Sequence, residues 1–169
     1  MSPDVLAPIQ PERRPVIGVI GASRPSPEGY RAAVAVGTFI AQCGAVLVCG
    51  GLGGVMEGAC RGCREAGGEA LGILPGGDER EANPYVTLAV ATNMGHARNV
   101  IIAHTACALI AVEGGYGTLS EIAVALKLGR PVISLGAWKE LPGVVWRRDP
   151  EAAVKEALAR GLAAERKRG

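Results

Sequence analysis

Short apolar runs that end in glycine-containing turns recur along this chain, and a segment with helical character follows each of them. The first run spans 16–21, and its helix is expected over 28–42. The run over 45–48 repeats the unit, with a helix ending near residue 66. Further strands are expected at 70–74, 86–90, 106–112 and 131–135, and further helices at 95–103, 118–127 and 150–164. This alternation predicts an α/β fold: a single Rossmann-like, three-layer, doubly wound parallel sheet with helices on both faces.

The length and composition of the chain indicate how it is divided. Its 169 residues, 49% of them hydrophobic, are enough for one well-buried core and too few for two. We expect a flexible N-terminal segment over 1–14, a Rossmann-like nucleotide-binding domain over 15–165 and a basic tail over 166–169. Aromatic residues make up only 4% of the chain, so the core should consist of Ala, Val, Ile and Leu.

The charge balance favours neither nucleic acid nor a membrane as partner. The formal net charge is +2, and one Phe, two Trp and three Tyr are too few for a basic groove with stacking aromatics. The first 15 residues carry charged side chains among four prolines, unlike a signal peptide. No apolar run approaches the roughly 20 residues of a membrane span. We therefore expect a cytoplasmic protein.

The five cysteines are odd in number and lie in apolar surroundings, which favours reduced thiols that pack as small hydrophobic side chains. Cys60 and Cys63 form a C-x-x-C pair, but no second pair exists, and His96 and His104 lack a matching ligand spacing. We expect this pair to pack on one helix face, and we expect no metal site. A single histidine such as His96 is a weak candidate for a ligand.

Residues 113–121, Glu-Gly-Gly-Tyr-Gly-Thr-Leu-Ser-Glu, follow an apolar run and open an apolar-periodic segment. The glycines let backbone N–H groups approach an anion where a Cβ would clash, and a helix that begins here adds the positive end of its dipole. Its phosphate-binding residues are expected to be Gly114, Gly115, Gly117 and Thr118. Glu121 lies about one helical turn further on, within reach of the sugar or base of a nucleotide. The segment predicts a site for a phosphorylated, nucleotide-sized ligand.

The other glycine turns should converge on the same crevice. Doubly wound sheets bind ligands at the carboxyl edge, where the strand order reverses, and each of these turns follows a strand at that edge. The further ligand-binding residues expected there are Gly21, Ser23, Gly50, Gly51, Gly54 and Met56. For Ser23 a ligand contact and a plain turn are both open, because serine near proline also suits a turn. NAD binding is disfavoured, since the first turn lacks G-x-G-x-x-G and no acidic residue ends the second strand.

Residues 50–56 (Gly-Gly-Leu-Gly-Gly-Val-Met) and the 114–121 segment, taken with Arg98, resemble the Rossmann-like Lonely Guy (LOG) superfamily. The resemblance covers residues 15–136. Members of the Lonely Guy family proper are phosphoribohydrolases that release a cytokinin-type base from its nucleoside 5′-monophosphate. The branch that includes the molybdenum cofactor carrier proteins is more similar in length and in the Gly-Gly-Tyr-Gly-Thr-Leu-Ser-Glu segment. Those proteins hold a pterin that carries a phosphate.

Many relatives in this superfamily have been labelled lysine decarboxylases, a chemistry that does not suit this chain. A pyridoxal phosphate Schiff base needs a lysine held in the active crevice. The lysines of the chain are Lys127, Lys139, Lys155 and Lys167. None of them falls in a glycine turn.

Four positions depart from the pattern of the hydrolases. Glu113 replaces the proline that opens their phosphate motif, Val55-Met56-Glu57 replaces Leu-Met-Gly, and Arg98-Asn99 replaces Arg-Lys. Arg98 and Glu121 match the two residues that the resemblance implicates in hydrolysis. Because the neighbouring positions differ from the hydrolases, the resemblance supports ligand binding more strongly than catalysis.

Two functions follow from these observations. The first is binding of a phosphorylated nucleotide-like or pterin ligand at the carboxyl edge, as in a molybdenum cofactor carrier. The alternative is a LOG-type phosphoribohydrolase that cleaves the N-glycosidic bond of a nucleoside 5′-monophosphate. Glu121 would then stabilise the oxocarbenium-like sugar and orient water, and Arg98 would hold the ligand or position Glu121. An Arg98–Glu121 ion pair without chemistry is also open, and whether the chain is an enzyme is left undecided.

Neither function requires a resident cofactor, since the bound molecule would be the molybdenum cofactor or a nucleoside monophosphate. The partner is therefore a phosphorylated small molecule. The segments 95–103 and 122–128 carry more hydrophobic surface than one sheet face requires, which predicts a homo-oligomer. The resemblance implies dimers or tetramers whose interface helices complete each site.

Overall fold

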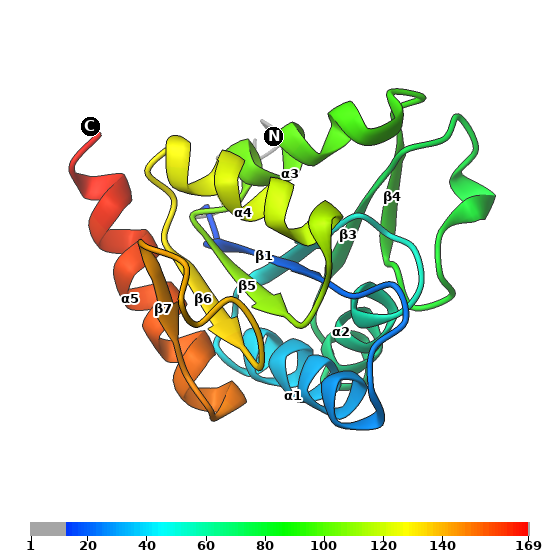
Figure 1. The fold of residues 1–169 in the computed structure, drawn as a ribbon. Helices are drawn as coiled ribbons and strands as arrows, with labels where there is room; N and C mark the ends of the chain where they lie inside the picture. Colours follow the sequence, from blue (N-terminus) through cyan, green and yellow to red (C-terminus); the bar gives the residue numbers. More distant parts are fainter. Residues whose placement is uncertain (1–12, 169) are drawn as a thin grey trace, which may run out of the picture.

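The computed structural model describes residues 13–168 and contains one parallel sheet with strand order β4-β3-β2-β1-β5-β6-β7 (Figure 1). Each neighbouring pair of strands in this sheet runs in parallel. The strands are β1 Val16–Gly21, β2 Val46–Cys49, β3 Ala70–Leu74, β4 Leu88–Ala91, β5 Ala108–Val112, β6 Val132–Leu135 and β7 Val144–Trp146. The fold class predicted from the sequence is confirmed.

Helices cover both faces of the sheet and complete the three layers (Figure 1). The helices are α1 Pro27–Gln42, α2 Val55–Glu65, α3 Arg98–Thr105, α4 Tyr116–Lys127 and α5 Pro150–Arg166, with short 3-10 helices η1 Glu79–Glu81 and η2 Gly95–Ala97. Helices α1, α2 and α5 pack against one face, and α3 and α4 pack against the other. A separate hydrophobic cluster lies on each side of the sheet.

The central strands are apolar on both faces because both faces are covered. All five residues of β5 are buried, and side chains from this strand enter both clusters: Ile110 lies in one and Leu109 in the other. A continuous apolar run, rather than an alternating one, is the pattern of a parallel strand between two helix layers. This explains why the run before residue 113 stood out in the sequence.

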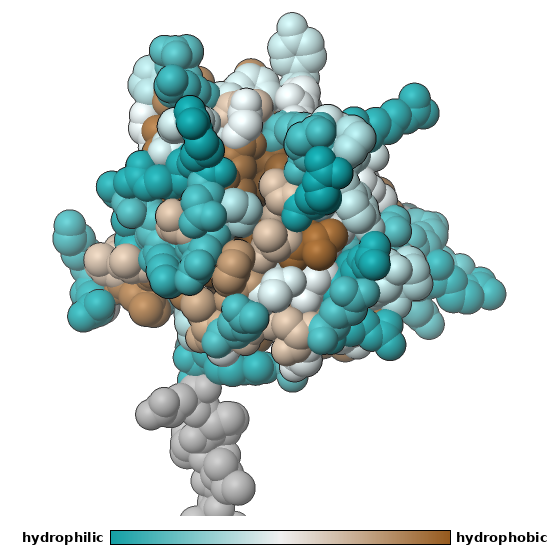
Figure 2. Space-filling model, turned by 90° about the horizontal axis from the view of Figure 1, so that it is seen from below, coloured by the Kyte–Doolittle hydropathy of each residue, from teal (hydrophilic) through white to brown (hydrophobic). Residues whose placement is uncertain are grey.

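Glycines bring α1 and α2 into close contact. A Cβ on Gly37 would lie 1.9 Å from the carbonyl oxygen of Ala59, and one on Gly62 would lie 1.9 Å from that of Val34. Neither position can hold a larger residue unless the helices move apart. Figure 2 views the molecule from the side of these helices, where hydrophilic residues predominate and hydrophobic residues show in smaller patches between them.

The structure differs from the sequence expectations mainly at the ends of elements. The expected helix over 95–103 is a 3-10 turn followed by α3, and α5 continues to Arg166. Strand β7 was not expected from the sequence, because three half-buried residues at a sheet edge leave no periodic signal. Beyond α5, the Arg168 side chain donates to the carbonyl oxygen of Leu128 at 2.9 Å, at the end of α4.

Most of the N-terminal segment expected over 1–14 lies outside the described residues. At the start of the described chain, Arg14 forms an ion pair with Glu69, which precedes β3. Across residues 13–168, no helix combines the length and the apolar character needed to cross a membrane.

Candidate functional site

A cleft of about 370 Å³ opens at the carboxyl ends of the central strands. Strands β1 and β5 are neighbours there although β2, β3 and β4 come between them in the chain, so the strand order reverses at this point. The cleft is lined by Val19, Ile20, Gly21, Ala22, Ser23, Met56, His96, Arg98, Asn99, Gly115, Gly117, Thr118 and Glu121. A crevice at the switch point of a doubly wound sheet is where such folds bind their ligands.

Helix α4 presents its N-terminus to the cleft. Its N-cap residue is Gly115, and no side chain caps the first turn. The N–H groups of an uncapped first turn, together with the helix dipole, favour an anion. Thr118 lines the same cleft and is 4% exposed. A Cβ on Gly114 would lie 2.1 Å from the Thr118 hydroxyl oxygen, so the loop passes directly over that side chain.

Glu113 anchors the loop before α4. Its backbone is left-handed, with φ of 55°, which is unfavourable for a residue with a Cβ. Its carboxylate accepts from the backbone N–H of Ser26 at 3.0 Å and from the Ser26 hydroxyl. Ser26 is the N-cap of α1 and accepts from the Gly29 N–H at 3.0 Å. The carboxylate of Glu113 is therefore directed to α1, which packs on the face of the sheet opposite α4.

Trp138 holds the same loop from the other side. Its indole Nε1 donates to the carbonyl oxygen of Glu113 at 3.3 Å, and its own backbone is also left-handed, with φ of 62°. The Glu113 N–H donates to the carbonyl oxygen of Leu135 at the end of β6. These bonds fix the loop, so the N-terminal end of α4 is held in place within the chain itself.

Arg98 is a buried cation within the cleft. It begins α3, is 7% exposed, and its Nη1 donates to the side-chain oxygen of Asn99. Its Nη2 lies 3.4 Å from the carbonyl oxygen of Gly50, but its buried Nε has no hydrogen-bond partner among residues 13–168. Burial lowers the pKa of this guanidinium below its ordinary value. The negative charge of Glu121 acts in the opposite direction but does not cancel the effect.

Glu121 is the carboxyl group of the cleft. It lies on α4 one turn after Gly117, is half-buried, and lines the same space as Arg98. Burial raises the pKa of Glu121 to about 7, and the nearby charge of Arg98 offsets only part of that effect. Within the described part of the chain the two side chains do not form an ion pair. The ion pair left open by the sequence is thus a longer-range attraction.

Four of the expected glycines do not line the cleft and are needed for its shape. A Cβ on Gly50 would lie 2.6 Å from Nη2 of Arg98, so glycine there makes room for the guanidinium. Gly51 and Gly54 have φ of 76° and 69°, and a Cβ on Gly54 would meet the carbonyl oxygen of Ala22 at 2.4 Å. Gly114 is the fourth, because of its contact with Thr118.

The cleft also contains two polar residues that sequence reasoning did not select. His96 was treated as a weak candidate, and Asn99 was noted only as a departure from a family pattern. Both flank Arg98, and this adjacency is the signal that could have found them. Cys60 and Cys63 are buried on α2, as expected for packing. The residues from 13 to 168 contain no group of three or more His, Cys, Asp or Glu arranged to hold a metal ion.

Comparison with known proteins supports the likeness seen in the sequence. The family model of the SLOG cluster4 family matches residues 14–161. An uncharacterised protein of Archaeoglobus fulgidus is 48% identical over 143 residues, which cover 85% of this chain and 94% of that protein. The solved molybdenum cofactor binding protein of Rippkaea orientalis has a TM-score of 0.84 at 36% identity, covering 88% of this chain and 98% of that one. The molybdenum cofactor carrier protein of Chlamydomonas reinhardtii has a TM-score of 0.80 at 35% identity, covering 89% and 99%.

Glu121 should make stability depend on pH. Because its pKa is raised to about 7 from 4.5, the folded chain binds a proton that the unfolded chain has lost, and stability falls as pH rises between these values. Urea unfolding of the wild type and Glu121→Gln at pH 5 and pH 8 isolates this effect. We expect the wild type to lose about 2–3 kcal/mol more than the variant on going to pH 8. Equal losses would contradict a raised pKa.

The contribution of the Glu113–Ser26 bonds to stability can be measured with two substitutions of Glu113. Glu113→Ala removes the bonds to Ser26 and keeps the unfavourable backbone, so we expect a loss of about 1–3 kcal/mol in denaturant unfolding. Glu113→Gly removes the same bonds but relieves the left-handed backbone, so it should be about 1 kcal/mol more stable than Glu113→Ala. If the two variants are equally stable, residue 113 does not keep the left-handed conformation in solution.

Proposed function

The chain belongs to the SLOG cluster4 family, and from this premise and the geometry of the cleft we propose that it binds a phosphorylated nucleotide-like or pterin ligand. The proposed ligand-binding residues of the cleft are Gly21, Ser23, Met56, Arg98, Gly115, Gly117, Thr118 and Glu121. Molybdenum cofactor, bound as cargo rather than as a resident cofactor, is the ligand we favour. The observation that carries the proposal is Arg98, a buried cation that forms no ion pair with a carboxylate among residues 13–168.

A buried guanidinium without a carboxylate partner calls for an anion from outside the chain. Arg98 is only 7% exposed, and its Nε has no hydrogen-bond partner in the described residues. A charge removed from water is strongly destabilising unless it is paired. A phosphate that enters the cleft would pair with the charge of Arg98, which lines it, and would meet the uncapped N-terminus of α4 at the same time.

The rest of the cleft suits the other half of such a ligand. Its volume of about 370 Å³ lies within the range of small-molecule clefts. Val19, Ile20 and Met56 supply apolar surface for a ring, while Ser23 and Asn99 supply polar groups that could orient it. Holding such a molecule requires no bond to break, and the two molybdenum cofactor proteins of similar structure support the carrier over the hydrolase.

Glu121 is the observation that keeps the phosphoribohydrolase as a second candidate. With a pKa of about 7, this carboxyl group holds or releases a proton near neutral pH, as a general acid or base must. On this reading Glu121 stabilises the developing positive charge of the sugar and orients a water molecule, while Arg98 holds the phosphate. A carrier has no need of such a group.

The protein is also proposed to assemble into a homodimer or homotetramer. Met94 and Val100, next to the cleft-lining segment 96–99, are 49% and 42% exposed, and Leu88 and Val90 on the edge strand β4 are 64% and 41% exposed. Exposed apolar side chains on neighbouring elements favour contact with another copy. Light scattering at micromolar concentration should give a mass at least twice that of the chain, and a monomer would refute this part.

Binding is tested by calorimetry with AMP, ribose 5-phosphate and molybdopterin on the wild type and on Gly115→Val/Thr118→Ala. A Cβ at Gly115 meets nothing within 4 Å, so valine should narrow the cleft without a clash in the fold. Because the Thr118 hydroxyl is lost and valine at residue 115 takes up space for the phosphate, the dissociation constant should rise at least about tenfold. Thr105→Ala is the matched control, because its hydroxyl bonds to its own helix at 2.7 Å and lies outside the cleft. Unchanged affinity in the double variant would refute the phosphate site.

The same proteins separate the carrier from the hydrolase. Chromatography of AMP incubations would detect free base and ribose 5-phosphate, with Glu121→Gln alongside. Binding without release supports the carrier. Release by the wild type that is lost in Glu121→Gln, while the variant still binds AMP, would overturn the carrier in favour of the phosphoribohydrolase.

A further inference from the structure

Two buried thiols lie in contact behind the cleft and have no part in the proposed binding. Cys49 is the last residue of β2, Cys60 lies on α2, and both are 0% exposed. Their sulfur atoms are 3.4 Å apart. A disulfide between them would require the two sulfurs to approach to about 2.05 Å.

The surroundings of the pair make Cys49 the better nucleophile. The hydrogen bond from Cys60 lowers the pKa of Cys49 and outweighs the opposing effect of burial, and the N–H of Gly51, which donates to the Cys49 sulfur at 3.3 Å, also lowers it. The same hydrogen bond, together with burial, raises the pKa of Cys60. The two sulfurs therefore differ, and Cys49 is the one that its neighbours favour as the thiolate, the form that attacks an oxidant.

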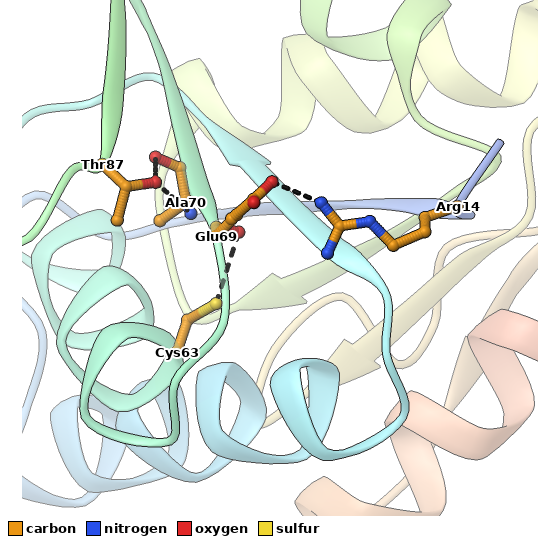
Figure 3. A network of polar contacts seen from close by, with 5 residues as sticks. All are labelled: Arg14, Cys63, Glu69, Ala70 and Thr87. Carbon is orange, nitrogen blue, oxygen red and sulfur yellow. Dashed lines mark hydrogen bonds and ion pairs between the residues drawn. The ribbon is translucent and has the colours of Figure 1, made fainter. Parts of the chain in front are cut away.

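The remaining cysteines are engaged elsewhere or are exposed. Cys63 lies one turn after Cys60, but its thiol donates to the carbonyl oxygen of Glu69 at 3.4 Å (Figure 3), and burial raises its pKa to about 11. Cys107 packs against Gly161, and Cys43 is exposed at the end of α1. The contact between Cys49 and Cys60 is therefore specific to these two.

We propose that Cys49 and Cys60 form a reversible disulfide when the protein meets hydrogen peroxide. The Cys49 thiolate attacks one peroxide oxygen, the O–O bond breaks, and a sulfenic acid forms on Cys49 as hydroxide leaves. The Cys60 sulfur then attacks the Cys49 sulfur, the S–O bond breaks, and the Cys60 proton leaves with the hydroxyl group as water. Together the two thiols lose two electrons, and one hydrogen peroxide gains them and is reduced to two waters. A dithiol reductant reverses the change by thiol–disulfide exchange.

Both ends of this disulfide are connected to the cleft. Cys49 is followed by Gly50, whose carbonyl oxygen lies 3.4 Å from Nη2 of Arg98. Cys60 lies one helical turn after Met56, which lines the cleft. A disulfide needs the sulfurs at about 2.05 Å, so the end of β2 and α2 must adjust toward each other. Oxidation should therefore disturb Arg98 and Met56 and weaken ligand binding, a consequence that rests on the proposed function.

Mass spectrometry of the native protein tests the disulfide without any ligand. Treatment with hydrogen peroxide should remove about 2 Da, the two thiol hydrogens, and digestion should link the peptides that contain Cys49 and Cys60. Cys60→Ala should abolish the loss, whereas Cys63→Ala, a matched change one turn away on the same helix, and Cys43→Ser should keep it. Peptide mapping of the wild type depends on no variant. If Cys43 is oxidised and no link between Cys49 and Cys60 forms, the proposal is wrong.

Calorimetry with AMP tests the connection to the cleft. The reduced protein should bind AMP, the oxidised protein should bind it at least threefold more weakly, and a dithiol reductant should restore the affinity. Equal affinity in both states would overturn the connection. If the reduced protein does not bind AMP, ribose 5-phosphate or molybdopterin, the proposed function fails, and the mass measurement still decides the disulfide.

Discussion

The pairing of β1 with β5 brings together the two turns around which the cleft is built. Five residues of each strand are in register, from Ile17 with Ala108 to Gly21 with Val112. A Cβ on Gly21 would lie 2.2 Å from the carbonyl oxygen of Val112, so the two strands can approach this closely only with glycine at that position. Ser23 lies in the turn after β1, and the loop before α4 follows β5. Because the two strands end side by side, both segments reach the cleft.

Removal from water has opposite consequences for the two charged groups of the cleft, and together these favour an anionic ligand. Arg98 is buried with its charge only partly compensated, so an incoming anion stabilises it. Glu121 responds to burial by a pKa near 7, so it is partly protonated at neutral pH and repels a phosphate less than an ordinary carboxylate would. The same desolvation therefore favours an anion beside Arg98 and leaves Glu121 partly protonated at neutral pH.

The loop before α4 combines an unfavourable backbone with bonds that offset it. Glu113 and Trp138 both adopt left-handed conformations, and each contributes a group to a bond that holds the loop. Ser26 connects this loop to α1 on the other face of the sheet. Glu113 stands where the hydrolase pattern has proline, and its bonds to Ser26 give its carboxylate a structural part at the start of α1.

The sequence by itself determined the alternation of elements, the parallel sheet and the loop-to-helix segment after residue 113. These features are local, since a buried parallel strand needs a continuous apolar run and a tight turn needs glycine. Tertiary structure alone decided what each residue in the turns does. Gly50 and Gly114 resemble Gly115 in the sequence, but the first two make room for Arg98 and Thr118, and only Gly115 lines the cleft. The raised pKa of Glu121 and the contact between Cys49 and Cys60 follow from burial and from neighbours far along the chain, which no local pattern encodes. The same is true of Arg98 Nε, which has no hydrogen-bond partner among residues 13–168.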